Sequence, residues 1–222
     1  MTCWTGDRAA EVVVCAILLT ASVGPTALEP GGVGPGAARV EVSAAAASPR
    51  VAGSVSSQLE RYAHPAADPL FGALWSLSRR LIMPVAGVDP GDLTDTFLQP
   101  RAVGRLHEAI DIRAPRDAPV LAVTDGVVLR LTEHDSGGIT LYLVAPDNRT
   151  LFYYAHLSGY ADGVRAGRAV RQGDVLGYVG DTGNAGPGNH HLHFEVMVAT
   201  SPQQYWAARP RNPYPLLKSA RG

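Results

Sequence analysis

Residues 189–196 read Asn-His-His-Leu-His-Phe-Glu-Val, a short run in which imidazole and apolar side chains alternate. In a β-strand, successive side chains point to opposite faces of the sheet. His191 and His193 therefore share one face, while Leu192 and Phe194 occupy the other. Two imidazoles on a wet strand face are an ordinary feature of sheets, so this pair indicates a functional site only if a second cluster joins it.

A second cluster occurs at residues 107–111, which read His-Glu-Ala-Ile-Asp. His107 and Asp111 are four residues apart and therefore lie on the same side of either a strand or a helix. The β-branched Ile110 and Ile112 favour the strand. Two nitrogens and one oxygen from three side chains, with one position left for water, form the ligand set of a catalytic zinc site.

Length and composition define the broad class of the chain. Its 222 residues suit one domain with appendages, and 46% apolar residues are sufficient for a hydrophobic core. The 24 glycines and 17 prolines indicate a turn-rich, strand-rich chain. A formal net charge of -1 provides no electrostatic basis for nucleic acid or an anionic membrane as the main partner.

An apolar run from Val12 to Val23 has the character of a signal-peptide core. It is shorter than the roughly 20 residues of a membrane-spanning helix and fits the roughly 7 to 15 residues of a signal's apolar region. We expect residues 1–24 to be a signal peptide, with an uncleaved N-terminal membrane anchor or a buried element of the domain as the alternatives. Cys3 and Cys15 both lie in this segment, so a cleaved chain would have no cysteine ligand or nucleophile.

Two further segments separate this region from the rest of the chain. Residues 25–57 are mostly Pro, Gly, Ala, Val and Ser, and we expect a flexible linker because they carry too little apolar surface to offset the entropy of ordering. Residues 58–83 are expected to be helical, since apolar residues recur at helical spacing from Asp68 to Leu81 and Pro69 suits the first helical position. This helix would pack on the following domain; the alternative is a pro-segment or a partner-binding helix.

After Pro84 the pattern changes to short runs rich in β-branched and aromatic residues, separated by turn residues such as Asp125-Gly126. Six or more strands at this spacing predict an antiparallel all-β domain, which we place at residues 84–217. The runs are residues 120–123, 127–131, 139–144, 150–154, 175–179 and 191–198.

Another histidine, His156, follows the run at residues 150–154 in the sequence Tyr-Tyr-Ala-His-Leu, where the strand is expected to end before Ser158-Gly159. Alone, it would be explained more simply as a hydrogen-bonded surface residue. Zinc hydrolysis, however, needs three protein ligands, an open position, and separate groups that move protons and hold the developing oxyanion. The residues available for these functions are His107, Asp111, His156, His191 and His193.

At this point the sequence resembles the lysostaphin-type (LytM-like) zinc metallopeptidases of bacterial cell walls. The resemblance extends from Pro84 to Leu217 and rests on the order and spacing of several motifs, each weak by itself. These are His107-x-x-x-Asp111, Ala118-Pro119-Val120-Leu121-Ala122-Val123 followed by Asp125-Gly126-Val127-Val128, Tyr154-Ala155-His156-Leu157, Gly180-x-Thr182-Gly183, His191-Leu192-His193-Phe194-Glu195 and Asn212-Pro213-Tyr214.

The resemblance implies both a fold and a site. The fold would be a duplicated hybrid motif of two antiparallel sheets that enclose a narrow groove. One Zn2+ per chain would be held by His107, Asp111 and His193, with His156 and His191 as catalytic residues beside the water and the scissile carbonyl. The implied activity is hydrolysis of peptide bonds in the stem peptide or cross-bridge of peptidoglycan, in the cell envelope or outside the cell.

Three positions depart from the family pattern, and none of them removes a site residue. Ala109 stands where the family commonly has Gly, Asp117-Ala118 replaces a usual Gly-Thr, and His190 takes a place often held by Pro. Asp117 is expected to adopt the left-handed conformation that Gly would supply. His190 is expected to face away from His191. The histidines that we place outside the site are His64, His134 and His190.

Two other classes of function share parts of this pattern. Some members of the family lack ligands and activate other wall hydrolases, so one alternative is a non-catalytic zinc-binding module; the presence of all five residues argues against it. A phosphocarrier domain of similar β architecture uses one imidazole to accept a phosphoryl group, but it has no need of Asp111 or of an export signal. Zinc content and hydrolysis of purified peptidoglycan distinguish these classes.

Overall fold

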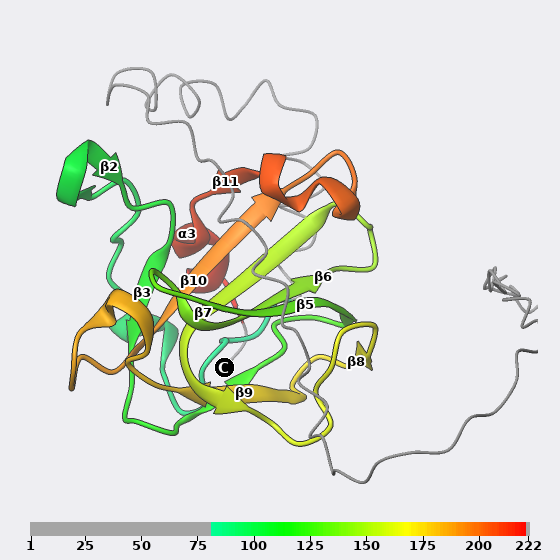
Figure 1. The fold of residues 1–222 in the computed structure, drawn as a ribbon, viewed down its shortest axis with the longest axis horizontal. Helices are drawn as coiled ribbons and strands as arrows, with labels where there is room; N and C mark the ends of the chain where they lie inside the picture. Colours follow the sequence, from blue (N-terminus) through cyan, green and yellow to red (C-terminus); the bar gives the residue numbers. More distant parts are fainter. Residues whose placement is uncertain (1–80, 221–222) are drawn as a thin grey trace, which may run out of the picture. The chain divides into compact units, whose positions relative to one another are not determined.

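The computed structural model describes residues 81–220, which form an antiparallel β fold with little helix (Figure 1). The predicted signal segment, the predicted linker and nearly all of the predicted helix from Asp68 to Leu81 lie outside the described residues. Residues 81–83, the end of the predicted helical segment 58–83, are described and are not helical: Ile82 donates a backbone hydrogen bond to Val123 at 3.1 Å, and the Leu81 side chain is buried in the core. Within the described residues, no helix combines the length and the apolar character needed to cross a membrane.

Nine strands join in one hydrogen-bonded sheet, and a two-stranded hairpin of β1 (Pro100–Arg101) and β2 (Arg105–Leu106) precedes it. The main path of the sheet has the order β11-β10-β7-β6-β5-β8; β3 pairs with β10, and β9 pairs with β4 and β7. All pairings are antiparallel, which confirms the predicted fold class. The strands are β3 (Ile110–Arg113), β4 (Pro119–Leu121), β5 (Gly126–His134), β6 (Gly138–Val144), β7 (Thr150–Tyr160), β8 (Ala169–Val170), β9 (Val175–Val179), β10 (His191–Val198) and β11 (Arg209–Arg211).

The long strand β7 connects two parts of this sheet. Its first part pairs with β10 and β6, while its end, beyond a register shift between Leu157 and Gly159, pairs with β9. In Figure 1, β9 accordingly runs in a different direction from β10, along the lower side of the fold. The two parts of the sheet are therefore continuous through β7, and the strands of both parts contribute side chains to the same hydrophobic core.

The core lies on the inner side of β10 and its neighbours. Leu192 and Phe194 are fully buried there, as the alternation predicts, and Phe152 stacks on Phe194 with 6.0 Å between ring centroids. Burying each such side chain contributes roughly 1.5 to 3 kcal/mol. Tyr154 is also buried, which raises the pKa of its phenol, and its hydroxyl accepts a hydrogen bond from the Val123 backbone at 3.2 Å. A one-residue slip of β10 would place its histidines in this core, so packing specifies the register.

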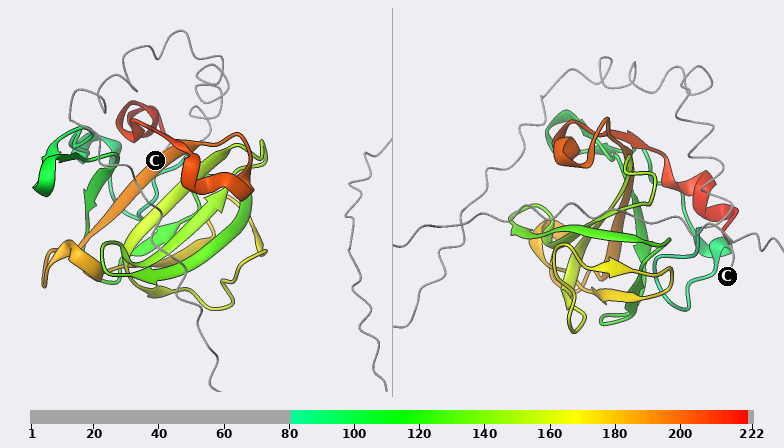
Figure 2. Two further views of the ribbon diagram at one scale, coloured as in Figure 1. Left: turned by 45° about the horizontal axis from the view of Figure 1, so that its top comes forward. Right: turned by 90° about the vertical axis from the view of Figure 1, so that its right-hand side faces the viewer.

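Short helices complete the fold, and α3 (Pro213–Lys218) packs Leu216 and Leu217 into the core. Figure 2 shows α3 at the C-terminal end of the chain and the short helix η5 at the end of β10. The bounds are η2 (Pro90–Asp92), η3 (Ala102–Gly104), η4 (Gly183–Ala185), η5 (Pro202–Ala207) and α3 (Pro213–Lys218).

Two local features relate directly to the sequence analysis. Asp117 has the expected left-handed backbone, with φ 63°, and its carboxylate accepts a hydrogen bond from the Ser158 hydroxyl at 2.6 Å. The helix α3 was not predicted, although Asn212 and Pro213 form a recognisable start signal. The Asn212 side chain accepts a hydrogen bond from the Tyr214 backbone at 2.9 Å and so caps the helix.

Candidate metal centre

Antiparallel pairing between β3 and β10 brings two of the predicted ligands together. In this register His193 lies directly opposite Asp111, and opposed residues of antiparallel strands have Cβ atoms about 4.5 to 5.5 Å apart. His107 reaches the same face from the loop between β2 and β3. The fold thus brings His107 and His193 together, although 86 residues separate them in the sequence.

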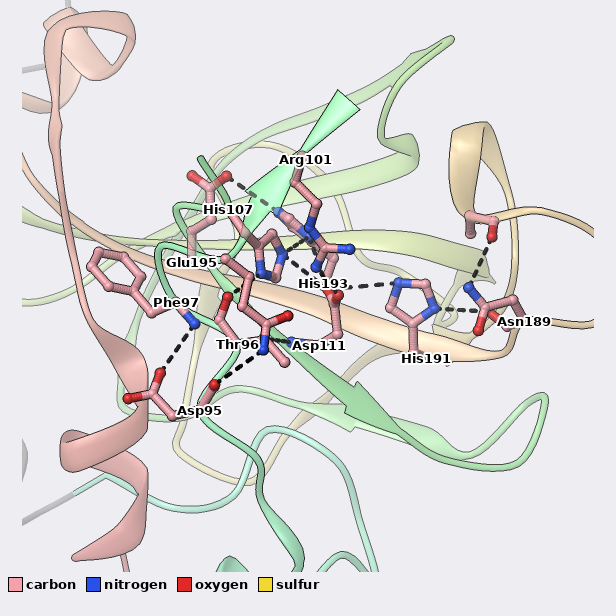
Figure 3. Close-up of polar contacts among 12 residues, drawn as sticks. Asp95, Thr96, Phe97, Arg101, His107, Asp111, Asn189, His191, His193 and Glu195 are labelled. Carbon is pink, nitrogen blue, oxygen red and sulfur yellow. Dashed lines mark hydrogen bonds and ion pairs between the residues drawn. The ribbon is translucent and has the colours of Figure 1, made fainter. Parts of the chain in front are cut away.

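Figure 3 shows the three side chains pointing toward one another. His107 Nε2 lies 3.1 Å from both His193 Nδ1 and Asp111 Oδ1, and His193 Nδ1 lies 3.2 Å from the same oxygen. No other group of three His, Cys, Asp or Glu side chains converges in this way within the described part of the chain. Two imidazole nitrogens and one carboxylate oxygen form a donor set that fits a catalytic metal such as zinc, because three protein ligands leave a position open.

The ligand atoms that face away from this centre have partners of their own. His107 Nδ1 donates to the Thr96 carbonyl oxygen at 2.8 Å, and His193 Nε2 donates to Glu195 Oε1 at 3.3 Å. The Thr96 hydroxyl also accepts a hydrogen bond from the Asp111 backbone at 3.0 Å. Such contacts orient metal-binding imidazoles and, in the neutral form of each ring, leave the inward nitrogen without a proton.

Asp111 and His193 shift one another's pKa. Burial opposes the ionisation of Asp111, but hydrogen bonds and charge from His107 and His193 outweigh it and hold the pKa of this carboxyl well below its usual value. Burial also disfavours the charged form of His193, yet hydrogen bonds to Asp111 and Glu195 raise the pKa of this imidazole above its usual value. A proton on His193 would therefore compete with a metal ion bound at this nitrogen.

Metal affinity is accordingly expected to fall as pH falls. Because the pKa of His193 is raised, the loss should begin above roughly pH 6.5, the value of an unperturbed histidine. The effect on folding has the opposite sign: a raised pKa stabilises the metal-free protein at low pH, and this stabilisation is lost as pH rises through the folded-state pKa. Zinc titrations against a competing chelator between about pH 5 and pH 8 measure the effect, and a flat profile would contradict it.

His156 and His191 flank the three donors. The ring centroids of His156 and His191 are 4.8 Å apart, and that of His156 lies 5.6 Å from the ring of His193. Each flanking ring donates its Nδ1 proton to a backbone carbonyl, His156 to Thr182 at 2.8 Å and His191 to Asn189 at 2.7 Å. The Nε2 atom of each ring is therefore an acceptor.

Burial keeps these two imidazoles neutral. It lowers the pKa of His156 to about 4, with the neighbouring His193 adding to the effect, and it also lowers the pKa of His191. Both rings can therefore accept a proton near neutral pH.

His156 also has φ 61°, a left-handed conformation that is uncommon for a residue other than Gly and that persists only when its surroundings impose it.

The surroundings of His156 include a close approach of two glycine-containing turns. Gly138 and Gly183 both have positive φ, and a side-chain carbon added at Gly183 would lie 2.3 Å from the Gly138 backbone nitrogen. Between them, the Thr182 hydroxyl accepts a hydrogen bond from the Ile139 backbone at 3.0 Å. The Gly180-x-Thr182-Gly183 motif thus holds the carbonyl that orients His156.

The histidines placed outside the site have other partners. His190 Nε2 lies 3.5 Å from Asp181 Oδ2, in agreement with the expectation that it faces away from His191. His134 forms hydrogen bonds with Ser136 and Tyr153. His64 lies outside the described residues.

Three residues that the sequence analysis did not assign also contact the centre: Thr96, Arg101 and Glu195. Glu195 lies two residues after His193 on the same strand face, so the alternation could have identified it. Thr96 and Arg101 precede the first motif, and no periodicity in the sequence distinguishes them. Their contacts arise from the hairpin of β1 and β2 and from the segment before it.

The sequence profile of peptidase family M23 matches residues 105–205, which include all five predicted site residues. The chain is 34% identical to the L-Ala–D-Glu endopeptidase of Bacillus subtilis (strain 168) over 120 residues, which cover 52% of this chain and 35% of that protein. It is also 34% identical over 95 residues to the peptidoglycan DD-endopeptidase ShyC of Vibrio cholerae, covering 42% of this chain and 21% of that protein. The aligned region thus spans about a third or less of these relatives.

Among solved structures, the catalytic domain of lysostaphin from Staphylococcus simulans aligns with a TM-score of 0.49 and 27% identity, covering 58% of this chain and 95% of that domain. The antiparallel fold and the converging donors are those expected of a metallopeptidase domain. Together with the match of residues 105–205 to the profile of peptidase family M23, they confirm the resemblance that the motifs indicated.

Proposed function

We propose that the chain is a zinc-dependent metalloendopeptidase that cleaves peptide bonds of bacterial peptidoglycan, in the stem peptide or the cross-bridge. The observation that carries the proposal is the convergence of His107, Asp111 and His193 beside two neutral imidazoles. The names of the Bacillus and Vibrio relatives support the substrate class, since both are endopeptidases and the second acts on peptidoglycan.

In this proposal His107, Asp111 and His193 would hold the ion. When bound, zinc supplies the Lewis acidity that activates a water molecule and polarises a carbonyl oxygen. The chain's own imidazoles move the protons: His156 and His191 are neutral, so each can accept a proton from the attacking water at Nε2. A ring protonated in this way then donates from Nε2 to the leaving nitrogen or to the developing oxyanion.

The backbone carbonyls behind these rings assist the transfer. Thr182 accepts a hydrogen bond from His156, and Asn189 accepts one from His191. Each contact favours the charged form of its imidazole and so partly offsets the burial that lowers the pKa. The rings are thereby neutral at rest and stabilised when they take up a proton.

Digestion of purified peptidoglycan by the full chain tests this function. Zinc-loaded protein should release new amino groups, a chelator should abolish the release, and one equivalent of zinc should restore it. Mass analysis of the muropeptides released from several wall types would identify the bond that is cut. Zinc-loaded protein that binds peptidoglycan without cleaving it would contradict the proposal and support the non-catalytic module instead.

We also propose that the chain acts in the cell envelope or outside the cell. The apolar run from Val12 to Val23 and the proposed substrate support this location. The mature protein is expected to begin after about residue 22 and to lack both cysteines, which N-terminal sequencing of the recovered protein checks. Intact Cys3 in envelope-bound protein would indicate an uncleaved anchor, and a purely cytosolic pool would contradict export.

A further inference from the structure

The two oxygens of the Asp111 carboxylate have different partners. Oδ1 faces the centre, 3.1 Å from His107 Nε2 and 3.2 Å from His193 Nδ1. Oδ2 faces away and accepts a hydrogen bond from Arg101 Nη2 at 2.5 Å. A carboxylate can bind a metal ion through one oxygen or through both. The guanidinium therefore occupies the oxygen that would make Asp111 a two-oxygen ligand.

The hairpin that precedes His107 delivers Arg101 to this position. Arg101 ends β1 opposite Arg105 of β2, and the His107 backbone donates to the Gln99 carbonyl oxygen at 2.9 Å, which ties the hairpin to the ligand. In Figure 3 the Arg101 side chain reaches over the centre toward Asp111. Because this side chain is 40% exposed, water screens the ion pair and its contribution to folding stability is small.

We propose that Arg101 is a positioning residue that restricts Asp111 to coordination through one oxygen. The inference rests on the proposed function in one respect only, that His107, Asp111 and His193 bind a metal ion. A second Asp111 oxygen on the metal would take the position that a water or substrate oxygen needs. By holding Oδ2 with a directional, charge-assisted hydrogen bond, Arg101 keeps that position open beside the two neutral imidazoles.

Cobalt(II) bound to the full chain tests the proposal, because four-coordinate cobalt absorbs visible light more strongly than five-coordinate or six-coordinate cobalt. The unmodified chain with one equivalent of cobalt should give the strong spectrum. Arg101→Gln should still bind one cobalt per chain but give the weaker spectrum of higher coordination. Arg101→Lys keeps a positive donor without the planar guanidinium and should recover part of the intensity. Turnover of Arg101→Gln at full zinc content should fall by about 10-fold to 100-fold.

Arg105→Gln is the matched control. Arg105 lies opposite Arg101 in the same hairpin, is exposed, and forms no ion pair with Asp111 among the described residues. This variant should keep the spectrum of the unmodified chain. The same spectrum in Arg101→Gln would overturn the proposal, as would a chain that takes up no cobalt. The spectrum needs no substrate, so a chain that leaves peptidoglycan intact while showing the expected change refutes the proposed function alone.

Discussion

His193→Ala is expected to lose stoichiometric zinc and, with it, the hydrolysis of peptidoglycan. His193 supplies one of three converging donors, and its Nδ1 lies 3.1 Å from His107 Nε2 and 3.2 Å from Asp111 Oδ1. Removing it leaves two donors, so affinity should fall by more than the roughly 10-fold to 100-fold that the loss of an outer partner costs. Metal analysis of the purified protein after dialysis against a weak chelator gives a direct measurement.

The fold of His193→Ala should survive this change. The side chain is 19% exposed and lies on the strand face opposite the buried Leu192 and Phe194, so its removal leaves the main core intact. A circular dichroism spectrum unchanged from that of the unmodified chain would establish this. His134→Ala, which removes a histidine outside the cluster, should retain zinc. A His193→Ala protein with full zinc content and full activity would refute the ligand assignment.

His156→Ala and His191→Ala are each expected to keep close to one zinc per chain and to lose at least about 100-fold in turnover. Neither ring belongs to the group of three converging donors, so the metal stays while proton transfer fails. General acid–base assistance is typically worth about 100-fold to 10,000-fold, and a single oxyanion donor about 100-fold to 1,000-fold. A 100-fold loss corresponds to about 2.7 kcal/mol in the barrier. Zinc content and turnover should be measured on the same preparations.

His190→Ala is the matched control for this pair. The residue is adjacent to His191 in the sequence, but its ring faces Asp181, so its removal should change turnover little. Equal damage from His190→Ala and His191→Ala would show that the strand-face assignment is wrong. The assignment would also fail if His191→Ala emptied the metal site while His193→Ala did not.

The arrangement within each strand follows from the local sequence. The predicted run at residues 191–198 is the strand β10, with Leu192 and Phe194 buried on one face and the ring of His193 on the other. The reason is geometric: the backbone of an extended chain sends successive side chains to opposite faces whatever the strand pairs with. A different local rule, that Asp in a turn tolerates the left-handed conformation, accounts for the backbone of Asp117. The strands β8 and β11 were not predicted, because two or three residues are too few to show a period.

The contacts between the donor atoms depend on how distant segments pack. The motifs contain five candidate residues, and the register between β3 and β10 places Asp111 opposite His193, although 82 residues separate them in the sequence. The contact of Arg101 with Asp111 likewise exists only because the first hairpin closes beside the sheet. Strand register and hairpin placement depend on hydrogen bonds and packing between distant segments, which no local periodicity encodes. Local sequence is therefore sufficient to predict which donor groups are available to the site, whereas the packing of distant strands determines which of these donors face one another.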